Sequence, residues 1–307
     1  MTVSETAKPT SAWRDPYVFG CLTIILGGLV LSLGVFFIRG AAGADAFQYI
    51  FWRSTGFTLA LVTVAAIRGN ADPIRQLRDL PLAGWIGGAS IALSAMTFIL
   101  ALKVSTFAET FFLCSLAPLM AAALAWPVLR ERLTTGTLIA IAVALVGVYV
   151  MVGGDFTGGN WVGRGLALFS AVCFAGYTLA TRAAKSGQLD ALLIAFGLIS
   201  IVGSAVILFV TGSDLVPPLK DAALAFIHGA VILSLGLWLF GQGSRHVSAV
   251  TLTMLAQVEA IASPIWAAIA FRETAGFGVV VGGALIFAAV VGQAVDAARR
   301  EATSRTR

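Results

Sequence analysis

Charged residues are scarce in this sequence of 307 residues. Asp, Glu, Lys and Arg make up 11% of it, whereas an ordinary soluble domain carries about 25%. Hydrophobic residues make up 59% of the chain. A soluble fold of this length cannot cover so much apolar surface, so we predict an integral membrane protein. The breaks between its apolar segments are short, and we expect no separate soluble domain.

Cysteine and histidine are also rare, with three and two residues respectively. Cys21, Cys114 and Cys173 lie far apart inside apolar runs, without the spacing of a metal site or a disulfide framework. His228 and His246 are isolated, and no HExxH, GxSxG or phosphate-loop motif occurs. The sequence therefore predicts neither an enzyme nor a metal site, and it indicates no cofactor.

Ten apolar segments have the length of about 20 residues that a membrane-spanning helix needs. Their approximate limits are 18–38, 46–67, 82–101, 106–129, 135–152, 162–181, 190–211, 222–241, 248–271 and 276–295. The first segment resembles a signal peptide ending near Ala42-Gly43-Ala44. Nine similar segments follow it, so we interpret it as the first span. The predicted fold class is an all-α membrane protein with ten transmembrane helices.

Lys and Arg are unequally distributed between the two ends of these segments. Fourteen fall in the tails and the even-numbered loops, and the other side carries Arg39, Lys103, Arg164, Lys220 and Arg272. The positive-inside rule makes the first side cytoplasmic. Both termini are therefore predicted on the cytoplasmic side of the cytoplasmic, or inner, membrane. This asymmetry explains most of the net charge of +5, so we expect no nucleic-acid partner.

The two halves of the sequence repeat each other. When the sequence is shifted against itself so that Arg130-Glu131 falls on Arg272-Glu273, Gly34 also falls on Gly176. This offset, which we call the repeat shift, corresponds to five spans, an odd number, so the second copy must be inverted in the bilayer. Inverted repeats are typical of secondary transporters, whose substrate site lies near the bilayer midplane. The predicted organisation is a tail at 1–17, repeats at 18–152 and 153–295, and a second tail at 296–307.

Three sequence features mark the spans of the first half. They are an Arg in the second span (Phe51-Trp52-Arg53), a Pro-containing fourth span that runs from Leu116-Ala117-Pro118 to Glu131-Arg132-Leu133-Thr134, and a Gly-rich fifth span. With these features each half resembles an EamA repeat of the drug/metabolite transporter superfamily, over residues 18–295. The runs 145–155 and 171–185 are most similar to those of aromatic amino-acid exporters. In the ninth span Ala260 occupies the usual proline position, and Pro264 lies one turn later.

This resemblance implies a secondary transporter that exports amino acids, aromatic and other neutral ones, by alternating access around a central site. The alternative on the same fold is an exporter of another small metabolite or of a cationic drug. A sugar-phosphate carrier would place several Lys or Arg within its spans, and only Arg53 qualifies. Proton coupling and facilitated diffusion both remain open. We expect the amino-acid substrate and the lipid bilayer to be its partners, and the chain to work as a monomer.

Polar and aromatic side chains inside the spans are the candidate substrate-binding residues. Glu259 lies about eleven residues into the ninth span, near the middle of a bilayer core of about 30 Å. It either binds a proton or a substrate ammonium group, or it forms a structural hydrogen bond. Other side chains form stripes at helical spacing that should face the bundle or a wet cavity. The predicted site contains Ser115, Phe174, Tyr177, Trp238, Gln242, Gln257 and Glu259.

Other charged residues near the span ends are assigned structural roles. Arg53 could bind a substrate carboxylate or pair with an acid, but we expect its side chain to extend to the outer interface. Glu109 follows Thr106 at the capping-box spacing, so its carboxylate should satisfy the start of the fourth span. We expect Arg130-Glu131 and Arg272-Glu273 to end helices and to contact water.

Overall fold

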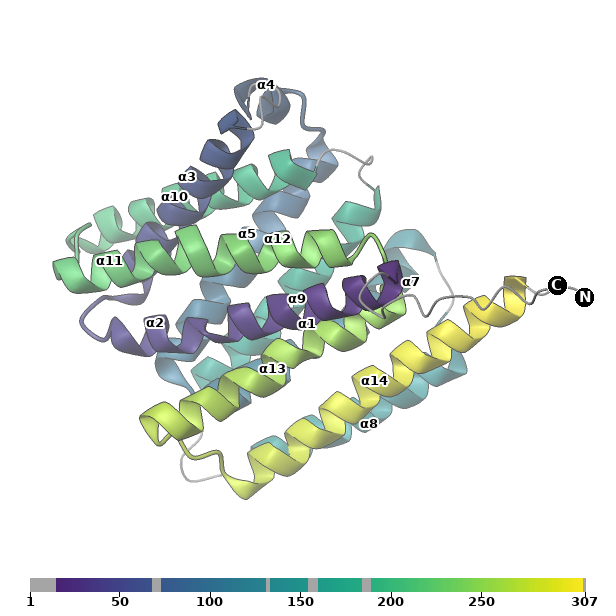
Figure 1. Cartoon of the computed structure of the whole chain (residues 1–307). Helices are drawn as coiled ribbons and strands as arrows, with labels where there is room; N and C mark the ends of the chain where they lie inside the picture. Colours follow the sequence, from purple (N-terminus) through teal and green to yellow (C-terminus); the bar gives the residue numbers. More distant parts are fainter. Residues whose placement is uncertain (1–14, 68–72, 131–132, 154–159, 184–188, 306–307) are drawn as a thin grey trace, which may run out of the picture.

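Ten membrane-length helical spans make up most of the described chain (Figure 1). The computed structural model describes residues 15–67, 73–130, 133–153, 160–183 and 189–305, and these residues contain no β-strand. The spans are α1 (Pro16–Ser32) with α2 (Gly34–Gly40), α3 (Ala46–Ile67), α5 (Leu82–Val104), α6 (Phe107–Cys114) with α7 (Ala117–Leu129), α8 (Thr135–Gly153), α9 (Trp161–Ala183), α10 (Leu189–Thr211), α11 (Leu219–Ile227) with η2 (His228–Leu233) and α12 (Ser234–Gly243), α13 (Ala249–Phe271) and α14 (Phe277–Arg305). The short α4 (Pro73–Arg78) connects α3 to α5. Each span coincides with a predicted segment.

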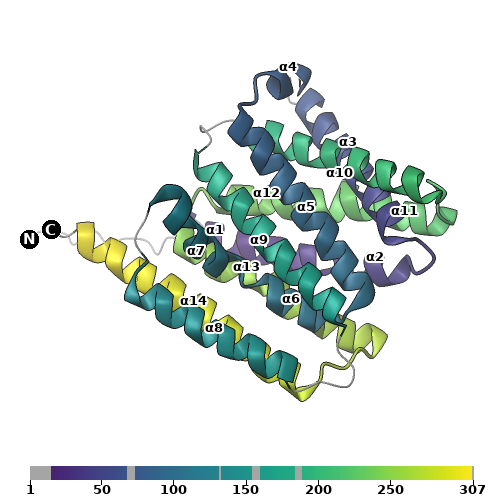
Figure 2. The same ribbon diagram turned by 180° about the vertical axis from the view of Figure 1, so that it is seen from behind.

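Helix neighbours follow the relation expected for two inverted repeats. The third span packs along the sixth, as α5 with α9, and the first packs along the eighth, as α1 with α12. A shift of five spans exchanges these two pairs. Three further pairs contain a span and its own counterpart, namely α3 with α10, α6 with α13 and α8 with α14. In both views α8 and α14 run side by side along one edge of the molecule (Figures 1 and 2).

The repeat is also visible in the helix caps, because the repeat shift aligns caps of the first half with caps of the second half. Arg130 and Arg272 end α7 and α13 with φ angles of 57° and 54°, and they are the two non-glycine residues with positive φ in the described chain. This left-handed conformation is a common way to end a helix. At the starts of α6 and α13, Thr106 accepts a hydrogen bond from the Glu109 amide, and Ser248 accepts one from Thr251. The prediction that both Arg-Glu pairs follow helix ends is confirmed at the arginines. Glu131 lies outside the described residues.

Three spans contain an irregularity that their counterparts lack. The first span breaks at Leu33, between α1 and α2, whereas its counterpart α9 is continuous. The fourth span breaks between α6 and α7, where Ser115 ends α6 and Pro118 lies in the first turn of α7. The ninth span, α13, is continuous although it contains Pro264. The eighth span contains the six-residue π-helix η2, whereas its counterpart α5 is a regular α-helix. The two repeats therefore share their topology but differ in local backbone geometry.

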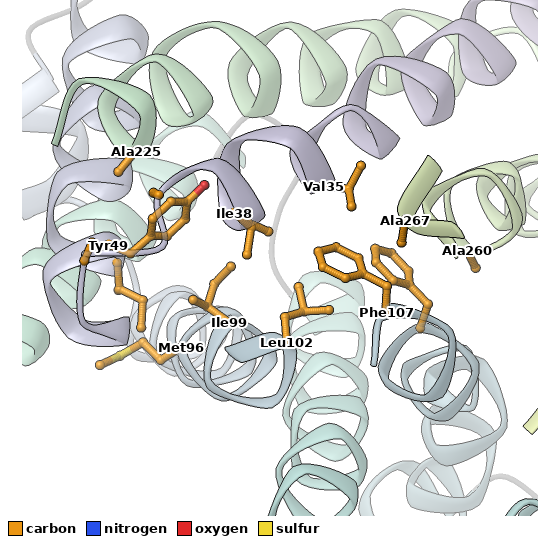
Figure 3. Packing of buried hydrophobic residues seen from close by; sticks show 14 residues of the cluster. Val35, Ile38, Tyr49, Met96, Ile99, Leu102, Phe107, Ala225, Ala260 and Ala267 are labelled. Carbon is orange, nitrogen blue, oxygen red and sulfur yellow. The ribbon is translucent and has the colours of Figure 1, made fainter. Parts of the chain in front are cut away.

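Helices from both repeats contribute to one buried apolar cluster (Figure 3). Val35, Ile99 and Leu102 come from the first repeat and meet Ala260 and Ala267 of α13. In Figure 3, Ile38, Ile99 and Leu102 lie between Tyr49 on one side and Phe107 on the other. The start of α1 and the end of α14 lie on the same side of the molecule (Figures 1 and 2), which we call the termini face. The cluster lies towards the opposite side, where α2 and the end of α13 lie (Figure 1). We call this side the Glu273 face, because Glu273 follows the end of α13.

Candidate functional site

Two predicted site residues occupy equivalent positions in the central helix pair. Ser115 ends α6 and Gln257 lies in the middle of α13, and the repeat shift relates them. Both are buried, and α6 packs against α13 where the two repeats meet. The Ser115 hydroxyl donates to the Phe112 carbonyl oxygen at 2.6 Å, so its own helix satisfies it. Gln257 has no hydrogen-bond partner among the described residues.

Glu259 lies half a turn beyond Gln257 on the same helix. Its side chain is partly buried, and no described residue forms a hydrogen bond or an ion pair with it. The backbone of α13 is very close to α1 here, because a Cβ atom at Gly28 would lie 3.3 Å from the Glu259 amide nitrogen. This carboxyl group therefore belongs to the region where α1, α6 and α13 come together. An unpaired acid at this depth is a functional hypothesis by default.

The aromatic candidates lie on two helices that flank this region. Phe174 and Tyr177 on α9 form an edge-to-face pair with ring centres 5.6 Å apart. Trp238 and Gln242 lie on α12, one turn apart. Phe174 is 44% exposed and Trp238 is 45% exposed, so neither ring is enclosed by the protein. The structure groups these residues by helix, and it records no ring contact between the α9 pair and Trp238 among the described residues.

A small polar cluster near the candidate site was only partly found from the sequence. Ser94 on α5 and Ser170 on α9 pair across the two helices, with each hydroxyl 2.9 Å from the other residue's carbonyl oxygen, to which it can donate, and the two Oγ atoms 3.1 Å apart. The Cys114 thiol donates to the Ala167 carbonyl oxygen at 3.5 Å. Ser170 lies one helical turn before the predicted residue Phe174, whereas no sequence pattern pointed to Ser94. The two serines satisfy each other and join the repeats.

Glu109 is not primarily a helix cap, contrary to the prediction. Its amide does donate to Thr106 Oγ1 at 3.2 Å, as the capping spacing predicts. Its carboxylate, however, forms a buried ion pair with Arg164 of α9 and accepts a hydrogen bond from Ser105. The prediction failed because Arg164, which is distant in sequence, is a stronger partner for a carboxylate than a backbone amide.

Glu273 has partners within the protein, which corrects the expectation that the Arg272-Glu273 pair contacts water. Its carboxylate pairs with Arg39 at 2.7 Å and accepts a hydrogen bond from the Phe107 amide. Arg39 in addition donates to the Ser105 carbonyl oxygen at 3.3 Å. Together with the Glu109–Arg164 pair these contacts form a continuous polar network on the Glu273 face. It joins α2, the start of α6, the start of α9 and the end of α13.

Arg53 is enclosed within the protein, so the expectation that it extends to the interface is wrong. Its side chain is only 5% exposed, and Nε and Nη2 have no hydrogen-bond partner among the described residues. One turn earlier on α3, the Tyr49 hydroxyl shares a hydrogen bond of 2.6 Å with His228 Nδ1 at the start of η2. The sequence did not indicate which way the Arg53 side chain faces.

Other kinds of chemistry have little support in the described part of the chain. No group of three or more His, Cys, Asp or Glu side chains there could hold a metal ion. The three cysteines are free and lie on different helices. The candidate site is thus a set of polar and aromatic side chains on membrane-spanning helices.

Comparison with known proteins gives a family and a fold. The model of the EamA-like transporter family matches residues 18–153 and 161–293, one match for each half of the chain. The comparison with curated proteins finds no match. A solved structure, described as a crystal structure of a protein, is similar with a TM-score of 0.62 and 19% identity. The similarity covers 93% of this chain and 98% of the other, and at this identity it supports the fold alone.

Proposed function

Because this chain belongs to the EamA-like transporter family, a family of membrane transporters for small substrates, we propose that it exports amino acids across the cytoplasmic membrane. Aromatic and other neutral amino acids are the proposed substrates, and alternating access of the two repeats is the proposed mechanism. The positive-inside rule supports cytoplasmic termini, so the Glu273 face would be the outer face.

One observation carries the proposal: Gln257 and Glu259 lie in the middle of α13, where the repeats meet, without a partner among the described residues. Lipid offers no partner to an amide or a carboxyl group, so such groups are retained when a solute or water binds them. Amino acids present an ammonium and a carboxylate group together with an apolar side chain. The aromatic residues Phe174, Tyr177 and Trp238 on the flanking helices provide apolar surface for that side chain.

Contacts between the repeats support alternating access. On the Glu273 face, Arg39 and Glu109 of the first repeat pair with Glu273 and Arg164 of the second. The ion pairs recorded near the termini face, Arg75–Asp79 and Arg300–Asp296, each lie within one segment. The Glu273 face thus carries two ion pairs that join the repeats. This arrangement fits a carrier closed on the Glu273 face.

Counterflow in proteoliposomes tests the function. Vesicles preloaded with unlabelled amino acids should accumulate labelled phenylalanine several-fold faster than empty vesicles, because a carrier exchanges substrates. Gln257→Leu should lower this rate about tenfold, which corresponds to the loss of a hydrogen bond worth about 1.4 kcal/mol. Gln293→Leu on α14 is the matched control and should leave the rate unchanged. If a cationic dye accelerated exchange while every amino acid failed, the substrate assignment would be wrong.

A further inference from the structure

Arg53 is a buried cation for which the described fold supplies no counter-charge. Its side chain is 5% exposed, two guanidinium nitrogens lack a hydrogen-bond partner, and no described carboxylate forms an ion pair with it. Arg164 offers a direct comparison, because it is 4% exposed and is paired with Glu109. Enclosing an unpaired charge has a large free-energy cost, so a group that stays in this state needs a compensating interaction from outside the protein.

The surroundings of Arg53 are built from an irregular segment of backbone. The π-helix η2 begins at His228, whose ring is held by the Tyr49 hydroxyl and stacks on Phe37 at 5.7 Å. At the next residue, Gly229, a Cβ atom would lie 1.8 Å from the Arg53 carbonyl oxygen. The two backbones are therefore in direct contact at Arg53. π-Helical turns inside α-helices are rare and occur frequently at functional sites.

The two spans equivalent to α3 and to the span that contains η2 pack together without a buried arginine and without a π-helix. The repeat shift relates Arg53 to Ala195 on α10 and Gly229 to Gly87 on α5. Ala195 is fully buried, and α5 is a continuous α-helix. The same pair of spans thus packs closely without an arginine and without a π-helix. Both features occur in one copy only, at the same place.

We propose that Arg53 is a binding residue for the carboxylate group of the transported substrate. The assignment rests on the proposed function, because it takes the anion to be that of an amino acid. A guanidinium group presents paired N–H donors that match the two oxygens of a carboxylate, and the pairing is strongest where water is excluded. Nε and Nη2 are enclosed without described partners, so a carboxylate reaches them only when the surrounding helices move, as the proposed alternating access requires.

A single carboxylate fits this place better than a phosphate. A phosphate group carries up to two negative charges and is usually bound by several cations. Lys103, whose ammonium lies 5.6 Å from the centre of the Tyr49 ring, donates to the carbonyl oxygens of Ala41 and Ala44 at 2.8 and 3.0 Å. Lys103 is therefore engaged by backbone, which leaves Arg53 as the cation available to an anion in this part of the described structure.

Thermal unfolding of the purified full-length protein in detergent tests the assignment with three probes. 3-Phenylpropionate has a carboxylate without an ammonium group, phenethylamine has the reverse, and L-phenylalanine has both. In the wild type, 3-phenylpropionate and L-phenylalanine should raise the Tm with saturating dose dependence, and phenethylamine should not reproduce the effect of 3-phenylpropionate. In Arg53→Gln the shift with 3-phenylpropionate should vanish, and Arg53→Lys should retain part of it.

The ligand-free Tm gives a second, independent readout. Arg53→Gln should not fall below the wild-type Tm, because the substitution removes an unpaired buried charge, whereas Arg164→Gln should lower the Tm clearly. An Arg53→Gln variant as unstable as Arg164→Gln, or a carboxylate shift that survives in Arg53→Gln, would overturn the assignment, as would the absence of any shift with 3-phenylpropionate in the wild type. If the shifts behave as expected but amino-acid counterflow fails, the anion site stands and the proposed function fails.

Discussion

Three buried charged residues, Arg164, Glu109 and Arg53, differ in whether the protein supplies them with a partner of opposite charge. Arg164 and Glu109 neutralise each other, and Ser105 adds a hydrogen bond to the carboxylate. Breaking such a buried pair by removing one partner typically costs about 3–5 kcal/mol. Arg53, by contrast, has no described partner of this kind, and neither has the partly buried Glu259. Both residues are therefore among those at which we expect a polar solute to bind.

The role of Glu259 can be tested at the level of the single residue. Glu259→Gln keeps the shape of the side chain and its capacity to form hydrogen bonds but removes its ability to ionise. We expect counterflow by the wild type to vary over roughly pH 5 to 8 and the rate of the variant to be flat and about tenfold lower, since hydrogen bonds to charged groups contribute about 1.5–3 kcal/mol. Asp190→Asn, at an exposed position on α10, is the control. Wild-type rates of Glu259→Gln across this range would make Glu259 a structural residue.

At the level of elements, hydropathy predicted where each span lies but not how its backbone is shaped. All ten spans were identified because any segment of about 20 apolar residues must be helical in lipid. The segment His228–Leu233 contains no proline or acidic residue that distinguishes it from the residues around it, so its π-helix could not be predicted. Pro264 shows the converse, because a proline inside a span did not break α13. Neither outcome follows from the local sequence.

The contact of η2 with α3 makes a sharp prediction about one glycine. Gly229→Ala would place a Cβ atom 1.8 Å from the Arg53 carbonyl oxygen, which is backbone and cannot move aside. We expect a loss of stability at or above the usual overpacking cost of about 1–3 kcal/mol, seen as a lower Tm and poor yield. Gly241→Ala is the matched control, because its Cβ would meet nothing within 4 Å and helix propensity favours alanine. Equal Tm values for both variants would show that η2 does not press against α3 as described.

At the scale of the whole molecule, the inverted repeat could be predicted because its markers are local. Arg130 and Arg272 end equivalent helices in the same left-handed conformation, and a shift of the sequence against itself finds them. The contacts that join the repeats could not be predicted, because they pair residues far apart, such as Arg39 with Glu273 and Ser94 with Ser170. The candidate site has the same difficulty. The position of a residue along its span and its polarity follow from the sequence. The direction in which its side chain points and the residue that it contacts depend on the fold.

The network on the Glu273 face should control access to the interior of the molecule. Glu273→Gln weakens the bond to Arg39, which we expect to shift the balance between closed and open states by about 1–2 kcal/mol, or about 5- to 30-fold. A cysteine replacing Val35, which is buried beneath this face, would report the change in a background where Cys21, Cys114 and Cys173 are replaced by serine. In detergent, a water-soluble maleimide should label it several-fold faster when Glu273→Gln is present.

Arg75→Gln is the matched control, because it removes an exposed charge pair with Asp79 that lies within the α4 region and joins no repeats. Its labelling rate at position 35 should equal that of the unaltered background. If Glu273→Gln also left the rate unchanged, the ion pair with Arg39 would have no gating role, and closure of this face would depend on the apolar cluster of Val35, Leu102 and Ala267 alone. Because apolar contact is not weakened by a change of charge, the two explanations give different labelling rates in the same experiment.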